Sequence, residues 1–200
     1  MKNSFLYISL LIFLVFTSHA KSNNSNQFNF NVTEIEILNN GNLIKGLKRG
    51  NINTDNGIII KADEFIYDKI TNILNAYGNI IIEDTITKKL ILSEEATYFK
   101  NLEKFSLKKN VLIQDKIKQR FISAQEATYF QNTENFNVKI DVFIDDKIKN
   151  QNLYADEVSY SKKDETYKTI GSSRILIKNK YQINSKNITY SIKEDKINSN

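Results

Sequence analysis

Hydrophobic and polar residues alternate along most of the chain with a period of two. Between residues 74 and 82 the aliphatic or small residues share one parity, and the same holds for residues 105–113 and 136–144. Successive side chains of a β-strand point to opposite faces, so this period predicts half-buried strands and not helices. The alternating set is Leu74, Ala76, Ile80, Ile82, Phe105, Leu107, Val111, Ile113, Phe136, Val138, Val142 and Ile144.

The strand pattern recurs as an internal repeat of about 31 residues. Five tyrosines mark it, separated by 31, 31, 31 and 30 residues. An alanine or serine lies five positions before each tyrosine, and an isoleucine or leucine lies seven positions before it. Such self-similarity is typical of architectures in which each unit buries its apolar face only against its neighbours. The tyrosines are Tyr67, Tyr98, Tyr129, Tyr160 and Tyr190, which give four complete units and an incomplete fifth.

The segment that ends in each tyrosine changes its inward parity part of the way along. In the first unit Ile60 and Ala62 share one parity, whereas Phe65 and Tyr67 share the other. A β-bulge or a sharp bend between them produces such a change of phase. Acidic or polar pairs occupy this point, where we expect the strand to turn outward. These pairs are Asp63-Glu64, Glu94-Glu95, Gln125-Glu126 and Asp156-Glu157.

The repeat length restricts the fold class. Two strands of about ten residues, joined by polar turns such as residues 68–72 and 100–104, account for one unit. Helical repeats do not fit a period of two, and a four-stranded propeller blade needs about 40 residues. An antiparallel two-sheet jelly roll and a β-solenoid remain. Long strands with bends in the middle favour the all-β jelly roll, in which two sheets fold over a shared interior.

The first twenty residues have the features of a secretory signal peptide. Lys2 gives a basic start, Phe5 to Phe16 is apolar apart from Ser9, and small residues surround a cleavage point after Ala20. The apolar stretch is shorter than the roughly 20 residues of a membrane-spanning helix, which favours cleavage over anchoring. We therefore expect a signal peptide at 1–20, a polar leader at 21–27 and one exported repeat domain at 28–200.

Composition removes most enzyme classes. The 200 residues include no cysteine, and the single histidine, His19, lies in the predicted signal peptide. The exported part therefore lacks the groups for thiol or imidazole catalysis and for a usual zinc site, so we expect no catalytic residue, metal or cofactor. The acidic pairs resemble the acid and base of a polysaccharide hydrolase. However, a catalytic pair should be unique, and a pair in every repeat is typical of a scaffold.

The net charge and the lysine pairs say less about function than the composition does. The net charge of +5 falls to +4 without Lys2. The pairs Lys88-Lys89, Lys108-Lys109 and Lys162-Lys163 fall at predicted turns or solvent-facing positions, where lysine favours solubility and protects sheet edges. Nucleic acid is not an expected partner, because the chain is exported and has no basic helical face.

One segment resembles the repeat of the OstA-like lipopolysaccharide transport family. Residues 62–67, Ala-Asp-Glu-Phe-Ile-Tyr, are similar to its Ala-Asp-x-x-x-Tyr element, and residues 74–82 are similar to its apolar-x-Ala-x-Gly-Asn-Val strand. The resemblance covers about residues 28–200. The later copies depart from it, since Gly78-Asn79 is replaced by Lys109-Asn110, Ile140-Asp141 and Gly171-Ser172. Some translocon members of the family also carry cysteines that this chain lacks.

The resemblance implies a V-shaped pair of sheets whose apolar interior shields the acyl chains of lipopolysaccharide, in the periplasm or at the outer membrane. Two alternatives stay open: the inward residues pack only against one another, or the chain is a structural or adhesive repeat protein. The inward-facing candidates for lipid binding are Leu74, Ile80, Ile82, Phe105, Val111, Ile113, Phe136, Val142 and Ile144.

The ends of the repeat array favour one type of family member. The last unit stops at Ile197, before its second strand, and residues 32–37 are a degenerate first copy suited to a cap. We therefore expect the N-terminal part of an LptD-type assembly protein, with an outer-membrane barrel downstream. The alternative is a stand-alone LptA-like bridge protein, whose edge strands would pair with other OstA-like domains.

Overall fold

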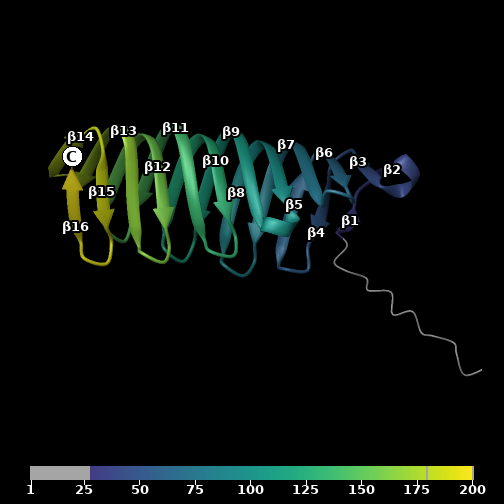
Figure 1. Cartoon of the computed structure of the whole chain (residues 1–200), viewed down its shortest axis with the longest axis horizontal. Coiled ribbons are helices and arrows are strands. Elements are labelled where there is room, and N and C mark those ends of the chain that lie inside the picture. Colours follow the sequence, from purple (N-terminus) through teal and green to yellow (C-terminus); the bar gives the residue numbers. More distant parts are fainter. Residues whose placement is uncertain (1–27, 179, 200) are drawn as a thin grey trace, which may run out of the picture.

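The computed structural model describes residues 28–178 and 180–199. These residues form sixteen strands in one antiparallel sheet, with two single-turn 3-10 helices, which confirms the all-β prediction. Figure 1 shows an elongated stack with β1, β2 and β3 at one end and β14, β15 and β16 at the other. The predicted signal peptide (1–20) and polar leader (21–27) lie outside the described residues.

The strands follow one another along the chain with short connections. They are β1 (Asn29–Asn31), β2 (Glu34–Leu38), β3 (Leu43–Leu47), β4 (Gly50–Asn53), β5 (Ile58–Ala62), β6 (Glu64–Asp68), β7 (Ile73–Asp84), β8 (Lys89–Phe99), β9 (Lys104–Asp115), β10 (Arg120–Phe130), β11 (Asn135–Asp146), β12 (Gln151–Ser161), β13 (Thr166–Ile177), β14 (Tyr181–Ser185), β15 (Ile188–Ser191) and β16 (Lys196–Ser199). The 3-10 turns are η1 (Asn39–Gly41) and η2 (Lys100–Leu102).

The sheet is folded along its length into two layers. In β7, residues 73–77 pair with β6, whereas residues 81–84 pair with β5. The strands β7 to β13 all cross from one layer to the other in this way. We call the layer that contains β2, β3, β6, β15 and β16 layer A, and the layer that contains β1, β4, β5 and β14 layer B. This architecture is the jelly roll that the long, bent strands predict.

A crease of β-bulges separates the layers. In β7, β9 and β11 two consecutive residues have positive φ, for example 64° at Lys109 and 53° at Asn110. The facing strand β8 has buried Ser93 and Ala96 on either side of the crease, with Glu94 exposed between them. The predicted change of parity and the outward position of the acidic pairs are therefore confirmed.

The contacts at the crease explain why the glycine of the repeat is present in β7 and β13 but absent from β9 and β11. A Cβ atom added to Gly78 would lie 2.6 Å from Oδ2 of Asp63, and one added to Gly171 would collide with the carboxylate of Asp156. In the two middle units Glu94 and Gln125 replace these aspartates, and the glycine positions hold Lys109 and Ile140. Glycine therefore occurs in the units where an aspartate carboxylate packs directly against the bulge.

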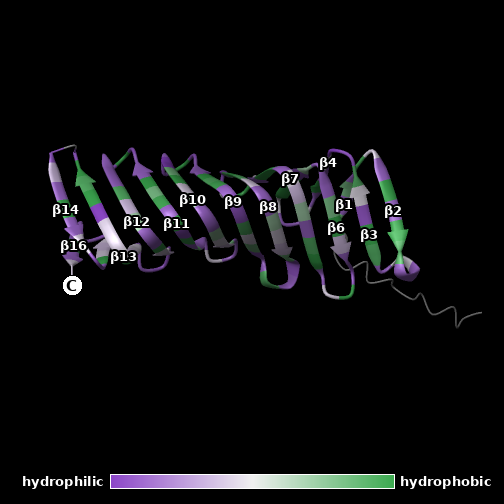
Figure 2. Cartoon of the chain, turned by 90° about the horizontal axis from the view of Figure 1, so that it is seen from above, coloured by the Kyte–Doolittle hydropathy of each residue, from purple (hydrophilic) through white to green (hydrophobic). Residues whose placement is uncertain are grey.

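The core lies between the layers. Inward side chains of both layers are buried from β4 to β13, and Figure 2 shows hydrophobic and hydrophilic residues alternating along the strands. The alternation places one set of side chains in the interior and the other on the outer surface. Among the described residues, no helix is both long and apolar enough to span a bilayer.

Candidate functional site

All nine residues that the sequence identifies as lipid-binding candidates have their side chains in the interior. None is more than 8% exposed. Leu74, Phe105 and Phe136 belong to layer A, and the other six belong to layer B. Contact with lipid stays a prediction for each of them.

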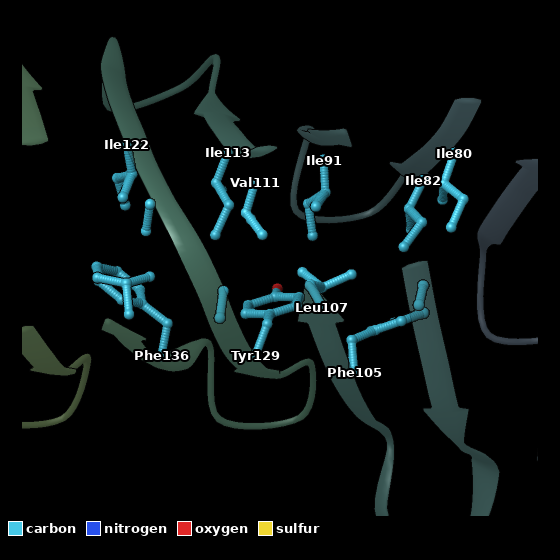
Figure 3. Close-up of a cluster of buried hydrophobic side chains, with 14 of the residues drawn as sticks. Ile80, Ile82, Ile91, Phe105, Leu107, Val111, Ile113, Ile122, Tyr129 and Phe136 are labelled. Carbon is cyan, nitrogen blue, oxygen red and sulfur yellow. The ribbon is translucent and has the colours of Figure 1, made fainter. Parts of the chain in front are cut away.

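The two layers present different side chains to each other. Figure 3 shows a row of aliphatic residues from layer B, including Ile82 and Ile113, opposite a row from layer A that contains Phe105, Tyr129 and Phe136. The ring of Phe105 stacks on Tyr98 of the neighbouring strand, with ring centroids 4.3 Å apart. The interior is thus aliphatic on one side and largely aromatic on the other.

The interior is closed in this conformation. The buried side chains of the two layers are in mutual contact, and between them lies a cavity of about 20 Å³. This volume is about that needed for one water molecule, far too small for an acyl chain. Its lining includes the charged residues Lys89, Asp115, Arg120 and Glu134. The residues that would contact lipid therefore form the hydrophobic core of this structure.

The tyrosine of the repeat lies at the side of the roll opposite the crease, where the turns of both layers meet. The ring is in the core, and the hydroxyl reaches the polar edge. The side-chain amide of Asn56 in layer B donates a hydrogen bond to the hydroxyl of Tyr98 in layer A at 3.0 Å. Two units further, the ammonium group of Lys118 donates to the hydroxyl of Tyr160 at 2.9 Å. Tyrosine suits this position because one end of its side chain is apolar and the other is polar.

Burial affects the acidity of these hydroxyls. It raises the pKa of Tyr129 and, together with the hydrogen bond to Asp195, raises that of Tyr190 to about 12. Burial is also the main cause of the raised pKa of Tyr98. The hydroxyls of Tyr98, Tyr129 and Tyr190 are therefore neutral at physiological pH and available as both donors and acceptors.

The sequence analysis missed the charged residues of this edge, and its interpretation of Lys89 as a solubility residue is wrong. Lys89 is only 8% exposed, and its ammonium group lies 2.6 Å from Glu134 of the other layer. Lys162 also contacts Glu134, at 3.0 Å. Lys89 lies at an inward-facing position at the start of β8, in phase with Ile91, so its alkyl stem enters the core while its charge reaches the edge.

The acidic residues at the crease stabilise the bulges. Asp63 accepts hydrogen bonds from the side chains of Asn79 and Arg49, which lower the pKa of its carboxyl group. Asp156 accepts one from the backbone N–H of Ser172, at 2.8 Å. These contacts agree with the interpretation of the acidic pairs as a scaffold. Among the described residues, no group of three or more metal-ligating side chains comes together.

Two open hollows lie on the outer face of layer B, away from the interior. The larger, about 740 Å³, is lined in part by Phe143, Tyr154 and Arg174, and the guanidinium carbon of Arg174 lies 4.1 Å from the ring centre of Tyr154. The smaller, about 540 Å³, is lined in part by Ile81 and Leu112. Both are surface features that no sequence pattern indicated.

Comparison with known proteins supports the fold. No family model and no curated protein matches the sequence. Among solved structures, the chain is similar to LptH of Pseudomonas aeruginosa, the LptA-homologous periplasmic component of the conserved lipopolysaccharide transport device. The TM-score is 0.50 and the identity is 10%, over 57% of this chain and 82% of LptH. The two proteins therefore share a fold.

Proposed function

We propose that this chain is a periplasmic member of the OstA-like family that carries lipopolysaccharide, with the acyl chains between its two layers and the sugars in water. The observation that carries the proposal is the long, mainly apolar interior, which every repeat extends in the same register. The fold shared with LptH, a component of a lipopolysaccharide transport device, supports the same role.

The physical chemistry of the interior is adequate for this role. Each acyl methylene removed from water contributes about 0.8 kcal/mol, so binding requires a long apolar surface and no chemical step. The inward rows supply that surface when the layers move apart. Lipid contacts then replace the contacts that the layers make with each other, which limits the cost of opening the core.

Two types of OstA-like protein are candidates for this chain. We propose the N-terminal domain of an LptD-type assembly protein, joined to an outer-membrane barrel, as the sequence analysis favours. The likeness to an LptA homologue favours the second candidate, a stand-alone bridge. Sequencing the gene beyond the codon for Asn200 tests this assignment: several hundred codons of alternating strands support the first candidate, and an immediate stop codon supports the second.

The partners proposed with this role are lipopolysaccharide and other OstA-like domains. Strand β2 pairs with β3 alone among the described residues, so its other edge is free for pairing. A second domain would add a strand there by backbone hydrogen bonds. The signal peptide at 1–20 and the domain boundaries at 28–200 belong to the same proposal.

Photocrosslinking tests the carrier role with a matched pair of positions. Phe136 faces the interior, whereas Phe143 on the same strand faces outward and lies against Tyr154. We expect benzoylphenylalanine at position 136 to crosslink purified lipopolysaccharide and the same residue at position 143 to crosslink none. An adhesive or purely structural protein would crosslink at neither position. Crosslinking at both to the same extent would indicate surface adsorption and contradict the proposal.

A further inference from the structure

If the proposed function holds, the closed interior must open before a lipid can occupy it. The crease cannot be the place of opening, because the backbone of β7 to β13 runs continuously through it from one layer to the other. The opposite side has only turns, and the layers are joined there by side chains. Layer B contributes the turns at residues 54–57, 85–88 and 116–119, and layer A contributes those at 100–103 and 131–134.

The contacts across this side are polar and repeat along the roll. Asn56 donates to the hydroxyl of Tyr98 and also, at 2.9 Å, to the side-chain oxygen of Gln131. The side-chain amide of Gln131 donates in return to the backbone oxygen of Asn56 at 3.1 Å. The Lys89–Glu134 ion pair and the Lys118–Tyr160 hydrogen bond follow further along the roll. We call these seven residues the seam: Asn56, Lys89, Tyr98, Lys118, Gln131, Glu134 and Tyr160.

The seam has the same design in different units. Asn56 precedes Tyr98 by 42 residues, and Lys118 precedes Tyr160 by the same number. Each pair joins a layer B turn to the tyrosine of layer A. In these two units the repeat therefore places a polar bond across the seam between the core and the solvent. Water can replace these bonds once the layers separate, because every donor and acceptor then finds a new partner.

A lipid with a polar headgroup and several acyl chains also favours a side opening. If its acyl chains lie between the layers and its headgroup stays in water, the part of the lipid that joins headgroup and chains has to cross the edge of the roll. Threading from one end through the closed interior would instead bury polar groups without hydrogen-bond partners. The seam provides polar partners for this crossing along the length of the roll.

We propose that the seam is a lateral gate. Its polar bonds hold the layers together in the closed conformation, and they open to admit the acyl chains sideways, unit by unit. Tyr98 and Tyr160 then have two tasks: their rings complete the apolar interior, and their hydroxyls close the gate. This inference rests on the proposed carrier function and adds the route by which the lipid enters.

A covalent link across the seam tests the gate. The chain has no cysteine, so paired cysteines can be placed at chosen sites. Asn56→Cys with Gln131→Cys, joined by a short bis-maleimide, locks layer B to layer A. The matched control joins two turns of layer B with the same reagent, at Lys88→Cys and Lys116→Cys, which are exposed and lie on adjacent turns joined by a backbone hydrogen bond.

The readout is capture of purified lipopolysaccharide by benzoylphenylalanine at position 136. We expect the lock across the seam to reduce capture at least tenfold, and the control link to change it less than twofold. Tyr160→Phe, which removes one seam bond, should increase the initial rate of capture several-fold and leave the final yield unchanged. Circular dichroism of each linked protein confirms that it remains folded.

The outcomes separate the two proposals. Undiminished capture by the locked protein would overturn the gate, because the lipid would then enter from an end, while the carrier function would stand. Absence of capture in the unlinked protein, the control and Tyr160→Phe alike would overturn the carrier function and the gate with it.

Discussion

The ammonium nitrogen of Lys89 lies 2.6 Å from a carboxylate oxygen of Glu134, so a buried cation of layer B meets an anion on a turn of layer A. Asp115, the nearest other carboxylate to Lys89 in layer B, is 3.9 Å away. The pair joins the layers at the edge of an apolar core, where water competes little for the charges. Its contribution to stability should therefore exceed that of an exposed ion pair.

Removing the anion tests this contribution. We expect Glu134→Gln to lower the free energy of unfolding by about 1–3 kcal/mol, because it leaves the buried ammonium group of Lys89 without its closest counter-charge. Urea unfolding at neutral pH measures the loss. Glu36→Gln, at an exposed position of β2, is the control and should change the stability by less than about 0.5 kcal/mol. Equal effects would contradict a specific role for the pair.

The same pair makes the stability dependent on pH. Burial opposes ionisation of Glu134, but hydrogen bonds from Lys89 and Lys162 outweigh it and lower the pKa of the carboxyl group. A carboxyl whose pKa is lower in the folded state contributes fully above its unfolded value, about 4.3. We expect the difference in stability between the wild type and Glu134→Gln to be constant near pH 7 and to shrink below about pH 4. A difference that grows on acidification would refute this assignment.

Two neighbouring tyrosines should respond in opposite directions when their hydroxyls are removed. The hydroxyl of Tyr160 accepts a hydrogen bond from Lys118, so Tyr160→Phe should cost about 1 kcal/mol. The hydroxyl of Tyr167 is buried without a hydrogen-bond partner among the described residues, and burial raises its pKa. We expect Tyr167→Phe to stabilise the protein by about 1 kcal/mol, because it removes an unsatisfied polar group. Thermal unfolding of both variants distinguishes this expectation from a common effect of losing a hydroxyl.

The crease offers a stabilising substitution. Ile140 has φ of 65° and is 51% exposed, so a β-branched residue occupies a left-handed conformation with little packing in return. Ile140→Gly should raise the free energy of unfolding by about 1 kcal/mol, because glycine adopts this conformation without strain. Gly78→Ala is the reciprocal variant and should destabilise the protein, since its Cβ would meet the Asp63 carboxylate. Urea midpoints that move in the same direction for both variants would contradict this account of the crease.

The strands and their bends could be predicted from sequence because they depend on local parity. Ser93 and Ala96 lie on either side of the crease at an odd spacing, and no contact with a distant residue is needed to find the break. The left-handed bulge was harder to find. Gly78 signals it in one unit, but Ile140 occupies the same backbone conformation without any signal in its residue type.

The seam could not be predicted in the same way, because its contacts join residues far apart in the chain. Asn56 and Gln131 are separated by 75 residues, and which turns face each other depends on the folding of the sheet into layers. A signal was present for Lys89, whose position has the inward parity of Ile91. Its charge favoured an assignment to the surface, although a long alkyl stem allows a lysine to satisfy both environments.

The free edge of β2 leads to a prediction about self-association. Ile35 and Ile37 are 47% and 66% exposed, and across β3 they continue the inward rows of Phe65 and Tyr67. An exposed apolar edge strand favours pairing with another chain. We expect the wild type to associate in a concentration-dependent manner and the double variant Ile35→Lys/Ile37→Lys to weaken this association at least tenfold in sedimentation experiments. Lysine at an edge opposes pairing because its charge would be buried in the new interface.

Ile70→Lys is the control for this prediction. It replaces an isoleucine that is 74% exposed on a turn, so it removes a similar apolar group without changing an edge strand. If Ile70→Lys weakened association as much as the edge variant, general surface hydrophobicity would explain the association, and pairing through β2 would be wrong.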